Sequence, residues 1–180
     1  MNKDIARVLL TEEQIKTRVS QLGRQIAEDY RDLNPTMVCI LKGAVMFYTD
    51  LVRSIDIPLT MDFMALSSYG NSTKSSGEVE IRKDLSTSIE GKHVIIVEDI
   101  VDSGFTLSYL TRMLASRGAK SIRLCTLLDK PTRRAPGITL KANYSGFEVA
   151  NEFVVGYGLD YAEYYRNLPY IGVLKPEIYE

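Results

Sequence analysis

The sequence predicts an α/β fold in which a mainly parallel sheet is flanked by helices. Short apolar runs, typical of strands buried on both faces, alternate along the 180 residues with segments of helical periodicity. Polar pairs follow three of these runs: Lys42-Gly43, Glu98-Asp99 and Asp129-Lys130. Because open α/β sheets bind ligands beyond the carboxyl ends of their strands, these pairs predict a site at one edge of the sheet.

The first half of the chain begins with a helix. Thr11 and Gln14 fit a capping box, and apolar residues follow at helical spacing until Asn34-Pro35 ends the pattern. The segment 67–77 is rich in Ser and Gly and is predicted to be a mobile loop. The elements predicted in this half are helix 11–34, strand 37–43, helix 44–54, strand 59–66 and strand 78–83.

The second half contains the clearest strand, the apolar run at 93–99, in which the single histidine, His93, is expected to face solvent at the strand end. A helix is predicted over 106–117, with Gly118 as its C-terminal glycine. Further strands are expected at 121–130, 152–158 and 170–174. With no linker or repeat, the 180 residues form one predicted domain.

Composition excludes several classes of protein. The hydrophobic fraction of 45% is ordinary for a soluble domain, and a net charge of −1 gives no reason to expect nucleic acid or membrane as a partner. Cys39 and Cys125 lie in apolar runs without metal-binding spacing, so both are expected in the core. The sequence has no signal-peptide pattern and no apolar stretch near the roughly eighteen residues of a membrane span, which predicts a cytoplasmic location.

The segment Asp102-Ser-Gly-Phe-Thr106 stands between the strand at 93–99 and the helix at 106–117. The free N–H groups and dipole of a helix start attract a phosphate, although Asp102 or Ser103 would equally serve as a simple helix cap. Glu98 and Asp99 suit three roles: solvated acids, ligands of Mg²⁺, or acceptors for ribose hydroxyls. A sugar phosphate would use both the acids and the cradle.

The sequence VIIVEDIVDSGFTL (94–107) resembles the phosphoribosyl-pyrophosphate (PRPP) signature of type I phosphoribosyltransferases. Four more segments, in the same order as in the family, resemble its hypoxanthine-guanine branch: LKGAVMF (41–47), SSYG (67–70), LLDKP (127–131) and FVVGYGLDYAEYYRNLPYIGVL (153–174). The resemblance implies a core over about 35–150, a small hood built from about 1–12 and 151–180, and a flexible lid loop at 67–78 that includes Ser68 and Tyr69.

The reaction implied by the resemblance is Mg²⁺-dependent purine salvage. Hypoxanthine or guanine would react with PRPP through an oxocarbenium-like transition state, giving IMP or GMP and pyrophosphate. The family also implies a homodimer or homotetramer. By the same resemblance, the 5′-phosphate would lie against Ser103, Gly104, Phe105 and Thr106, and Glu98 and Asp99 would face the ribose and a magnesium ion.

The remaining site residues are also implied by the resemblance. Asp102 would act at N7 of the purine, either as general base or as an electrostatic stabiliser. Lys130 would donate to the six-oxo group, Phe153 would stack on the base and the Val154 backbone would meet its edge. Lys42, Gly43 and Arg166 would bind pyrophosphate, with a cis peptide at Lys42-Gly43, and Asp160 would ligate a second magnesium ion.

Alternatives remain at this stage. A xanthine-preferring relative would differ only in contacts to the two-position of the base. A PRPP-sensing regulator that binds nucleic acid would need a basic surface or an added module, for which the net charge and length give no support. An α/β phosphotransfer domain with an aspartate at a strand end would lack the Ser/Thr-rich cradle after Asp102. Phe153, Lys42-Gly43 and Asp160 taken alone are ordinary strand or turn residues.

Overall fold

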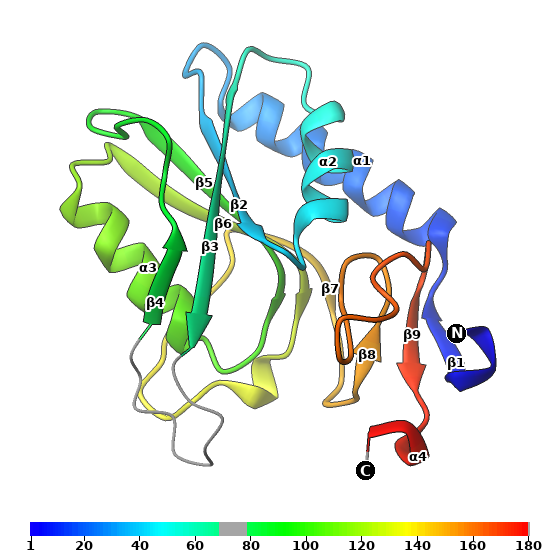
Figure 1. Cartoon of the computed structure of the whole chain (residues 1–180). Helices are drawn as coiled ribbons and strands as arrows, with labels where there is room; N and C mark the ends of the chain where they lie inside the picture. Colours follow the sequence, from blue (N-terminus) through cyan, green and yellow to red (C-terminus); the bar gives the residue numbers. More distant parts are fainter. Residues whose placement is uncertain (69–78, 180) are drawn as a thin grey trace.

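Six strands form the main sheet of the computed structural model, which describes residues 1–68 and 79–179 (Figure 1). The strand order is β4-β3-β2-β5-β6-β7, and only β4 runs antiparallel to its neighbour. The bounds are β2 Thr36–Leu41, β3 Thr60–Ser68, β4 Val79–Lys83, β5 His93–Val101, β6 Ser121–Asp129 and β7 Tyr144–Glu148. The predicted α/β class with a mainly parallel sheet is confirmed.

Helices cover both faces of this sheet. On one face, α1 (Glu12–Asp29) and α2 (Val45–Arg53) pack over Met37, Cys39, Ile95 and Val97, while α3 (Phe105–Ser116) packs on the other face (Figure 1). The alternate residues of β2 and β5 point to the α3 side, because successive side chains of a strand project to opposite faces. Both faces are therefore buried, which explains the continuous apolar runs. Both cysteines are buried and free.

Helix α1 begins as the sequence predicts. The Thr11 side chain accepts a hydrogen bond from the Gln14 N–H, and the Gln14 side chain accepts one from the Thr11 N–H, so the capping box is complete. The helix ends at Asp29, earlier than predicted, and the chain then passes through positive φ at Asp32 and Asn34. Of the helices that the structure describes, none has both the length and the apolarity needed to span a bilayer.

A second, antiparallel sheet brings the two ends of the chain together in the hood. Its order is β1-β9-β8, with β1 Ile5–Leu10, β8 Val154–Val155 and β9 Ile171–Leu174. Short helices complete the described chain: η1 Asn2–Asp4, η2 Pro131–Arg133 and α4 Pro176–Tyr179. Strands β1 and β7 were not predicted from the sequence. Both are edge strands with mostly exposed or half-exposed residues, so neither shows the continuous apolar pattern of a buried strand.

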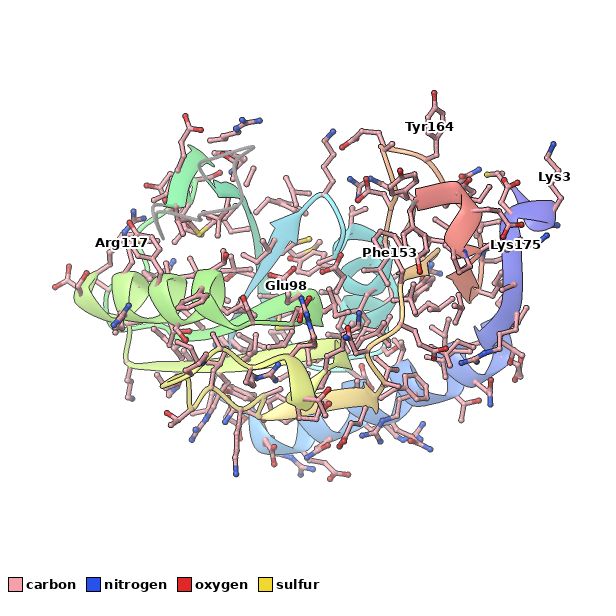
Figure 2. All side chains as sticks on the ribbon, turned by 90° about the horizontal axis from the view of Figure 1, so that it is seen from below. Lys3, Glu98, Arg117, Phe153, Tyr164 and Lys175 are labelled. Carbon is pink, nitrogen blue, oxygen red and sulfur yellow. The ribbon has the colours of Figure 1, made fainter. Side chains whose placement is uncertain are left out.

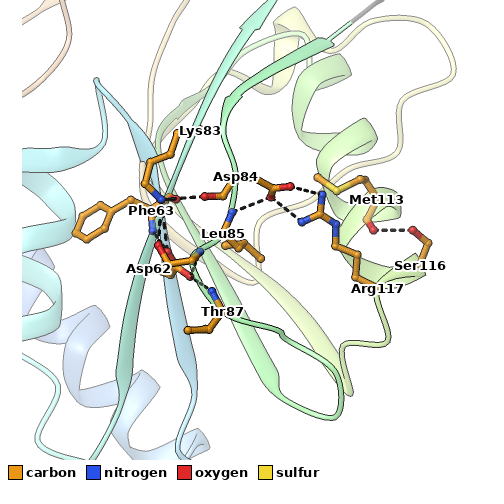
Figure 3. A network of polar contacts seen from close by, with 10 residues as sticks. Asp62, Phe63, Lys83, Asp84, Leu85, Thr87, Met113, Ser116 and Arg117 are labelled. Atoms are coloured by element: carbon orange, nitrogen blue, oxygen red, sulfur yellow. Dashed lines mark hydrogen bonds and ion pairs between the residues drawn. The ribbon is translucent and has the colours of Figure 1, made fainter.

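A buried carboxylate anchors the segment between β4 and β5 (Figure 3). Asp62, only 4% exposed, accepts hydrogen bonds from the N–H groups of Phe63, Ser86 and Thr87 at 2.8–3.3 Å. Burial alone would raise the pKa of Asp62, but these donors stabilise the ionised form and hold the pKa below its usual value. The chain from β4 is thereby fixed to β3.

The same segment is tied to α3. Asp84 accepts two hydrogen bonds, of 2.6 and 2.8 Å, from the guanidinium of Arg117, which directly follows the helix (Figure 3). The Arg117 contact lowers the pKa of Asp84. The C-terminal end of α3 is thus held to the body of the sheet while its N-terminal end faces the candidate site.

We expect Asp62→Asn to lower the free energy of unfolding by about 1–3 kcal/mol at pH 7, because the amide places an N–H group against backbone N–H donors. The folded pKa of Asp62 lies below the unfolded value, so its contribution is present above about pH 4 and is lost as pH falls further. Urea unfolding between pH 7 and pH 3 should show that the difference in the free energy of unfolding between wild type and Asp62→Asn becomes smaller in acid.

Asp56→Asn is the matched control, because Asp56 is exposed. Its free energy of unfolding should stay within about 0.5 kcal/mol of wild type. If Asp62→Asn had the same free energy of unfolding as wild type at pH 7, or if the difference became larger in acid, the anchoring role would be contradicted.

Candidate active site

The carboxyl ends of three neighbouring strands carry the predicted site residues. β5 presents Glu98 and Asp99 before the turn into α3, β2 leads into Lys42-Gly43, and β6 is followed by Lys130. The structure thus brings these residues together at the edge of the sheet where the sequence predicts a ligand site. Figure 2 shows Glu98 near the start of α3 and Phe153 farther toward the hood.

A cavity of about 320 Å³ joins the two acids to the turn before α3. Its polar lining consists of Glu98, Asp99, Asp102, Ser103, Gly104 and Thr106. Burial raises the pKa of Glu98 well above its usual value, and the adjacent Asp99 carboxylate raises it further. Burial also raises the pKa of Asp99, against the opposing effects of its contact with Glu98, the Ile100 N–H and the Arg166 charge. The pair therefore favours fewer than two negative charges until a ligand supplies hydroxyl donors or a cation.

The start of α3 carries no side-chain cap, which leaves its first N–H groups open to a ligand. Its N-cap residue is Gly104, at φ +82°, with no side-chain capping bond, so neither Asp102 nor Ser103 caps the helix. A Cβ on Gly104 would come within 2.8 Å of Ile138, so glycine is needed for both conformation and space. The Phe105 side chain is 51% exposed, which leaves the backbone, Ser103 and Thr106 to face an anion.

A second cavity, of about 430 Å³, lies on the hood side of Asp102. Ile100 and Asp102 line both cavities, and the second is completed by residues of the 130s loop and hood: Lys130, Arg133, Asn151, Glu152, Phe153, Val154, Leu159 and Tyr179. The Asp102 carboxylate accepts a 3.0 Å hydrogen bond from Arg133. Asp102 therefore stands where the two cavities meet.

Lys130 is buried and fixed in direction. Its ammonium donates a hydrogen bond to the Glu152 carbonyl at 2.8 Å, and Lys130 also lines the second cavity. Burial lowers the pKa of Lys130, although the Asp102 charge opposes this effect. The remaining N–H groups of the ammonium are available to an acceptor in the cavity.

Val154 presents its backbone to the same cavity. β8 is an edge strand, and the Phe153 carbonyl accepts a hydrogen bond from the Leu174 N–H at 2.9 Å. That bond makes Val154 and Val173 a non-hydrogen-bonded pair of the ladder. The N–H and carbonyl of Val154 consequently point away from β9 toward the open edge, where a planar ligand could pair with them.

The four residues implied to meet pyrophosphate and its metal lie together, with one carboxylate that the sequence analysis missed. Glu163 accepts a 2.7 Å hydrogen bond from Lys42 and a 3.2 Å hydrogen bond from Arg166. Arg166 also lies 3.0 Å from Asp160 and donates to the Gly158 carbonyl at 2.8 Å. Glu163 thus neutralises two cations that a multiply charged anion would bind.

The loop that carries this cluster is conformationally strained. Four non-glycine residues between 156 and 166 have positive φ: Tyr157, Ala162, Glu163 and Tyr165. Each such residue costs of order 1–3 kcal/mol, and residues of this kind concentrate at functional sites. The hood therefore holds the loop in one conformation at a cost to stability.

Gly43 is enclosed by two parts of the site. A Cβ there would overlap the Asp99 carboxylate, and a Cβ on Gly158 would overlap the Gly43 carbonyl. The cis peptide expected at Lys42-Gly43 is wrong by one residue, since the structure has it at Leu41-Lys42. The expected solvent exposure of His93 is also wrong in part: His93 is half-buried, with its Nδ1 2.7 Å from the Ser121 hydroxyl.

Arg134 is a second residue that the sequence analysis did not find. Its guanidinium donates to the carbonyls of Val101, Asp102 and Lys130 at 2.7–3.3 Å and pairs with Asp129. It therefore ties the turn before α3 to the loop after β6. The sequence signal for Arg134 is weak: Arg133 and Arg134 form an arginine pair shortly after the predicted strand 121–130.

The predicted lid falls mostly outside the described residues. Ser68 is the last residue of β3, and Tyr69 and residues up to 78 are not among those that the structure describes. Within the described ranges, no three acidic, His or Cys side chains form a group that could hold a metal ion by themselves.

The chain matches the phosphoribosyl transferase domain family over residues 8–162. It is 58% identical over 180 residues to the hypoxanthine-guanine phosphoribosyltransferase of Bacillus subtilis (strain 168), covering 100% of this chain and 99% of that protein. It is also 58% identical over 179 residues to the bifunctional protein TilS/HprT of Listeria innocua, where it covers 99% of this chain but spans only 27% of that longer protein.

Solved structures give the same result. A crystal structure of a hypoxanthine phosphoribosyltransferase from Staphylococcus aureus superposes with a TM-score of 0.96 at 52% identity. The match covers 100% of this chain and 97% of the other. The main sheet, the hood and their connections are thus those of the solved relative.

We expect Gly158→Ala to destabilise the protein more than Gly91→Ala. Both glycines have positive φ, but a Cβ on Gly91 meets nothing within 4 Å, whereas one on Gly158 would overlap the Gly43 carbonyl. Gly91→Ala should cost about 1–2 kcal/mol from conformation alone, and Gly158→Ala at least about 1 kcal/mol more from overpacking. Denaturant unfolding measures both free energies. An equal loss of free energy of unfolding in the two variants would show that the hood loop is not in close contact with Gly43.

Proposed function

Since this chain belongs to the phosphoribosyl transferase family, in its hypoxanthine-guanine branch, we propose that it joins hypoxanthine or guanine to the ribose 5-phosphate of PRPP. The products are IMP or GMP and pyrophosphate, a purine salvage reaction. The observation that carries the proposal is the pair of adjoining cavities that share Asp102. One has an anion cradle and two acids for a sugar phosphate, and the other has a cation, an aromatic ring and a backbone edge for a base.

The reaction breaks the bond from the anomeric carbon to pyrophosphate and forms a bond from that carbon to N9 of the purine. The purine loses one proton, and pyrophosphate leaves with the electron pair of the broken bond. Positive charge develops on the ribose, so the carboxylates of Glu98, Asp99 and Asp102 stabilise it electrostatically. Asp102 lines both cavities, which supports a role for its carboxylate in holding the proton of the base at N7.

Lys130 supports a preference for six-oxo purines. Its ammonium is buried and already bonded to the Glu152 carbonyl, so its remaining N–H groups need an acceptor. A six-oxo group accepts such a bond, whereas the six-amino group of adenine would place a donor against a donor. A site of this kind rejects the wrong partner strongly. Phe153 and the Val154 edge would complete base binding.

The leaving group has its own cations. Lys42 and Arg166 would bind pyrophosphate beside Gly43, replacing their contacts with Glu163. Glu98, Asp99 and Asp160 fit Mg²⁺ in the manner common for this ion, in which one or two carboxylates act together with substrate phosphates and water. Bound Mg²⁺ would neutralise phosphate charge. The predicted lid at 67–78, with Ser68 and Tyr69, would exclude water.

The proposal also covers assembly, domain organisation and location. A homodimer or homotetramer, a core over about 35–150 and a cytoplasmic location are proposed, the last supported by two free, buried cysteines that suit a reducing compartment. A xanthine preference, which would depend on contacts of the backbone near Val154 with the two-position, is not favoured by the relatives. The relatives do not favour a nucleic-acid-binding regulator.

A base-specificity assay tests the proposal. The purified full chain is incubated with PRPP and Mg²⁺ and, separately, with hypoxanthine, guanine, xanthine and adenine, and nucleotide formation is followed by absorbance. We expect IMP and GMP to form, with little product from adenine. No nucleotide from either hypoxanthine or guanine would refute the proposed activity, and product mainly from xanthine would establish the alternative.

Asp102→Asn should lower kcat by roughly 10²–10⁴-fold, because the amide cannot take a proton from the base. PRPP affinity, measured by isothermal titration in the presence of Mg²⁺, should change little, since the cradle amides and hydroxyls remain. Asp56→Asn serves again as the control. Near-normal turnover of Asp102→Asn would remove Asp102 from proton transfer.

Lys130→Met should lower kcat/KM for hypoxanthine by roughly 10- to 100-fold, the value expected for losing a hydrogen bond from a charged donor. The KM for PRPP should stay close to wild type. Lys141→Met, at an exposed lysine, is the control. Equal kinetics for hypoxanthine in Lys130→Met and the control would exclude the six-oxo contact.

A further inference from the structure

An aromatic cluster surrounds Phe153 at the mouth of the base cavity. The Tyr179 ring stacks on Phe153, with centroids 4.7 Å apart and planes 20° from parallel. The Tyr161 ring meets Phe153 in a T-shaped contact at 5.6 Å. Phe153 is nevertheless 38% exposed, so part of its ring remains open. A partly exposed phenylalanine directly before the two-residue strand β8 would change rotamer readily, and the two tyrosines restrict it.

Tyr179 is itself held in place by the hood. The Lys175 N–H donates to the Asp4 carbonyl at 3.0 Å, and the Ile178 N–H donates to the Lys175 carbonyl at 3.0 Å, which fixes the start of α4. Ile178 and Tyr179 pack against the small hydrophobic cluster of the hood. Figure 1 shows α4 beyond the C-terminal end of β9, below β8 and β9. The Tyr179 ring is therefore carried by a segment that hydrogen bonds and apolar packing hold in place.

Tyr179 also lines the base cavity, together with Asp102, Lys130 and Phe153. An aromatic ring has two faces. Tyr179 stacks on one face of Phe153, and Phe153 is still 38% exposed, so a planar ligand would use the opposite face of the ring. Offset stacking of successive rings is favourable, and an oriented ring loses less entropy when a ligand binds.

We propose that Tyr179 is a positioning residue for the purine, which stacks on the free face of Phe153 while Tyr179 supports the opposite face. The proposal rests on the proposed function and adds a residue to its base site. Stacking acts on the face of the base and not on its edge groups. The contribution of Tyr179 is therefore equal for hypoxanthine and guanine, in contrast to that of Lys130.

Steady-state kinetics of three variants test the proposal. Tyr179→Ala should raise the KM for hypoxanthine and for guanine by a similar factor, roughly two- to tenfold, the range of aromatic pair energies. Its kcat and its KM for PRPP should stay within about twofold of wild type, because the cradle and Asp102 are untouched. Tyr179→Phe keeps the ring and should restore both base KM values. Tyr164→Ala, at a tyrosine 71% exposed on the hood, should match wild type.

Three results would overturn the proposal. An unchanged base KM in Tyr179→Ala would show that the stack does not support the base. A lowered base KM would show that Tyr179 occupies the place of the base and competes with it. A fall in kcat with unchanged base KM, accompanied by a lower melting temperature, would show a purely structural role. Wild-type protein without turnover would refute the proposed function, which separates that failure from these three.

Discussion

The close approach of backbone at Gly43 is the constraint on which the site depends. Gly43 has the Asp99 carboxylate on one side and Gly158 of the hood on the other, and neither glycine leaves room for a Cβ. The acids of β5, the turn after β2 and the strained hood loop therefore meet without intervening side chains. Lys42 and Arg166, 124 residues apart in the chain, reach the same Glu163 carboxylate because this contact brings their loops together.

The acidic and the basic side chains occupy separate but neighbouring regions of this site. Half-buried Glu98 lies beside buried Asp99, and desolvation together with the Asp99 charge raises the pKa of Glu98, which favours a ligand that brings hydroxyl groups or a cation to the pair. The cations lie at the Gly43 side, and the uncapped start of α3 lies beyond Asp102. The proposed substrate, a sugar phosphate with a charged leaving group, would satisfy all three regions. Asp102 joins this arrangement to the base cavity because it lines both spaces.

The supporting contacts explain how the site keeps its shape. Arg134 binds three carbonyls on two loops, so the cradle and Lys130 are held relative to each other. The Asp62 and Arg117 contacts hold the far end of α3 and the segment before β5. The hood contributes a strained loop, an edge strand and an aromatic stack. Much of the binding geometry is consequently fixed before a ligand arrives, which lowers the entropy cost of binding.

The sequence by itself determined the α/β class, the buried strands, the Thr11 capping box and the contiguous segment 94–107, because each depends on residues close together in the chain. Tertiary structure alone decided the contacts of Glu163 with Lys42, of Arg134 with Asp102 and of Tyr179 with Phe153, which join segments distant in sequence. It also revealed the edge strands β1 and β7, most of whose residues are exposed or half-buried. Local periodicity reports which face of an element is buried. Which loops meet at Gly43 follows only from the packing of the hood on the sheet.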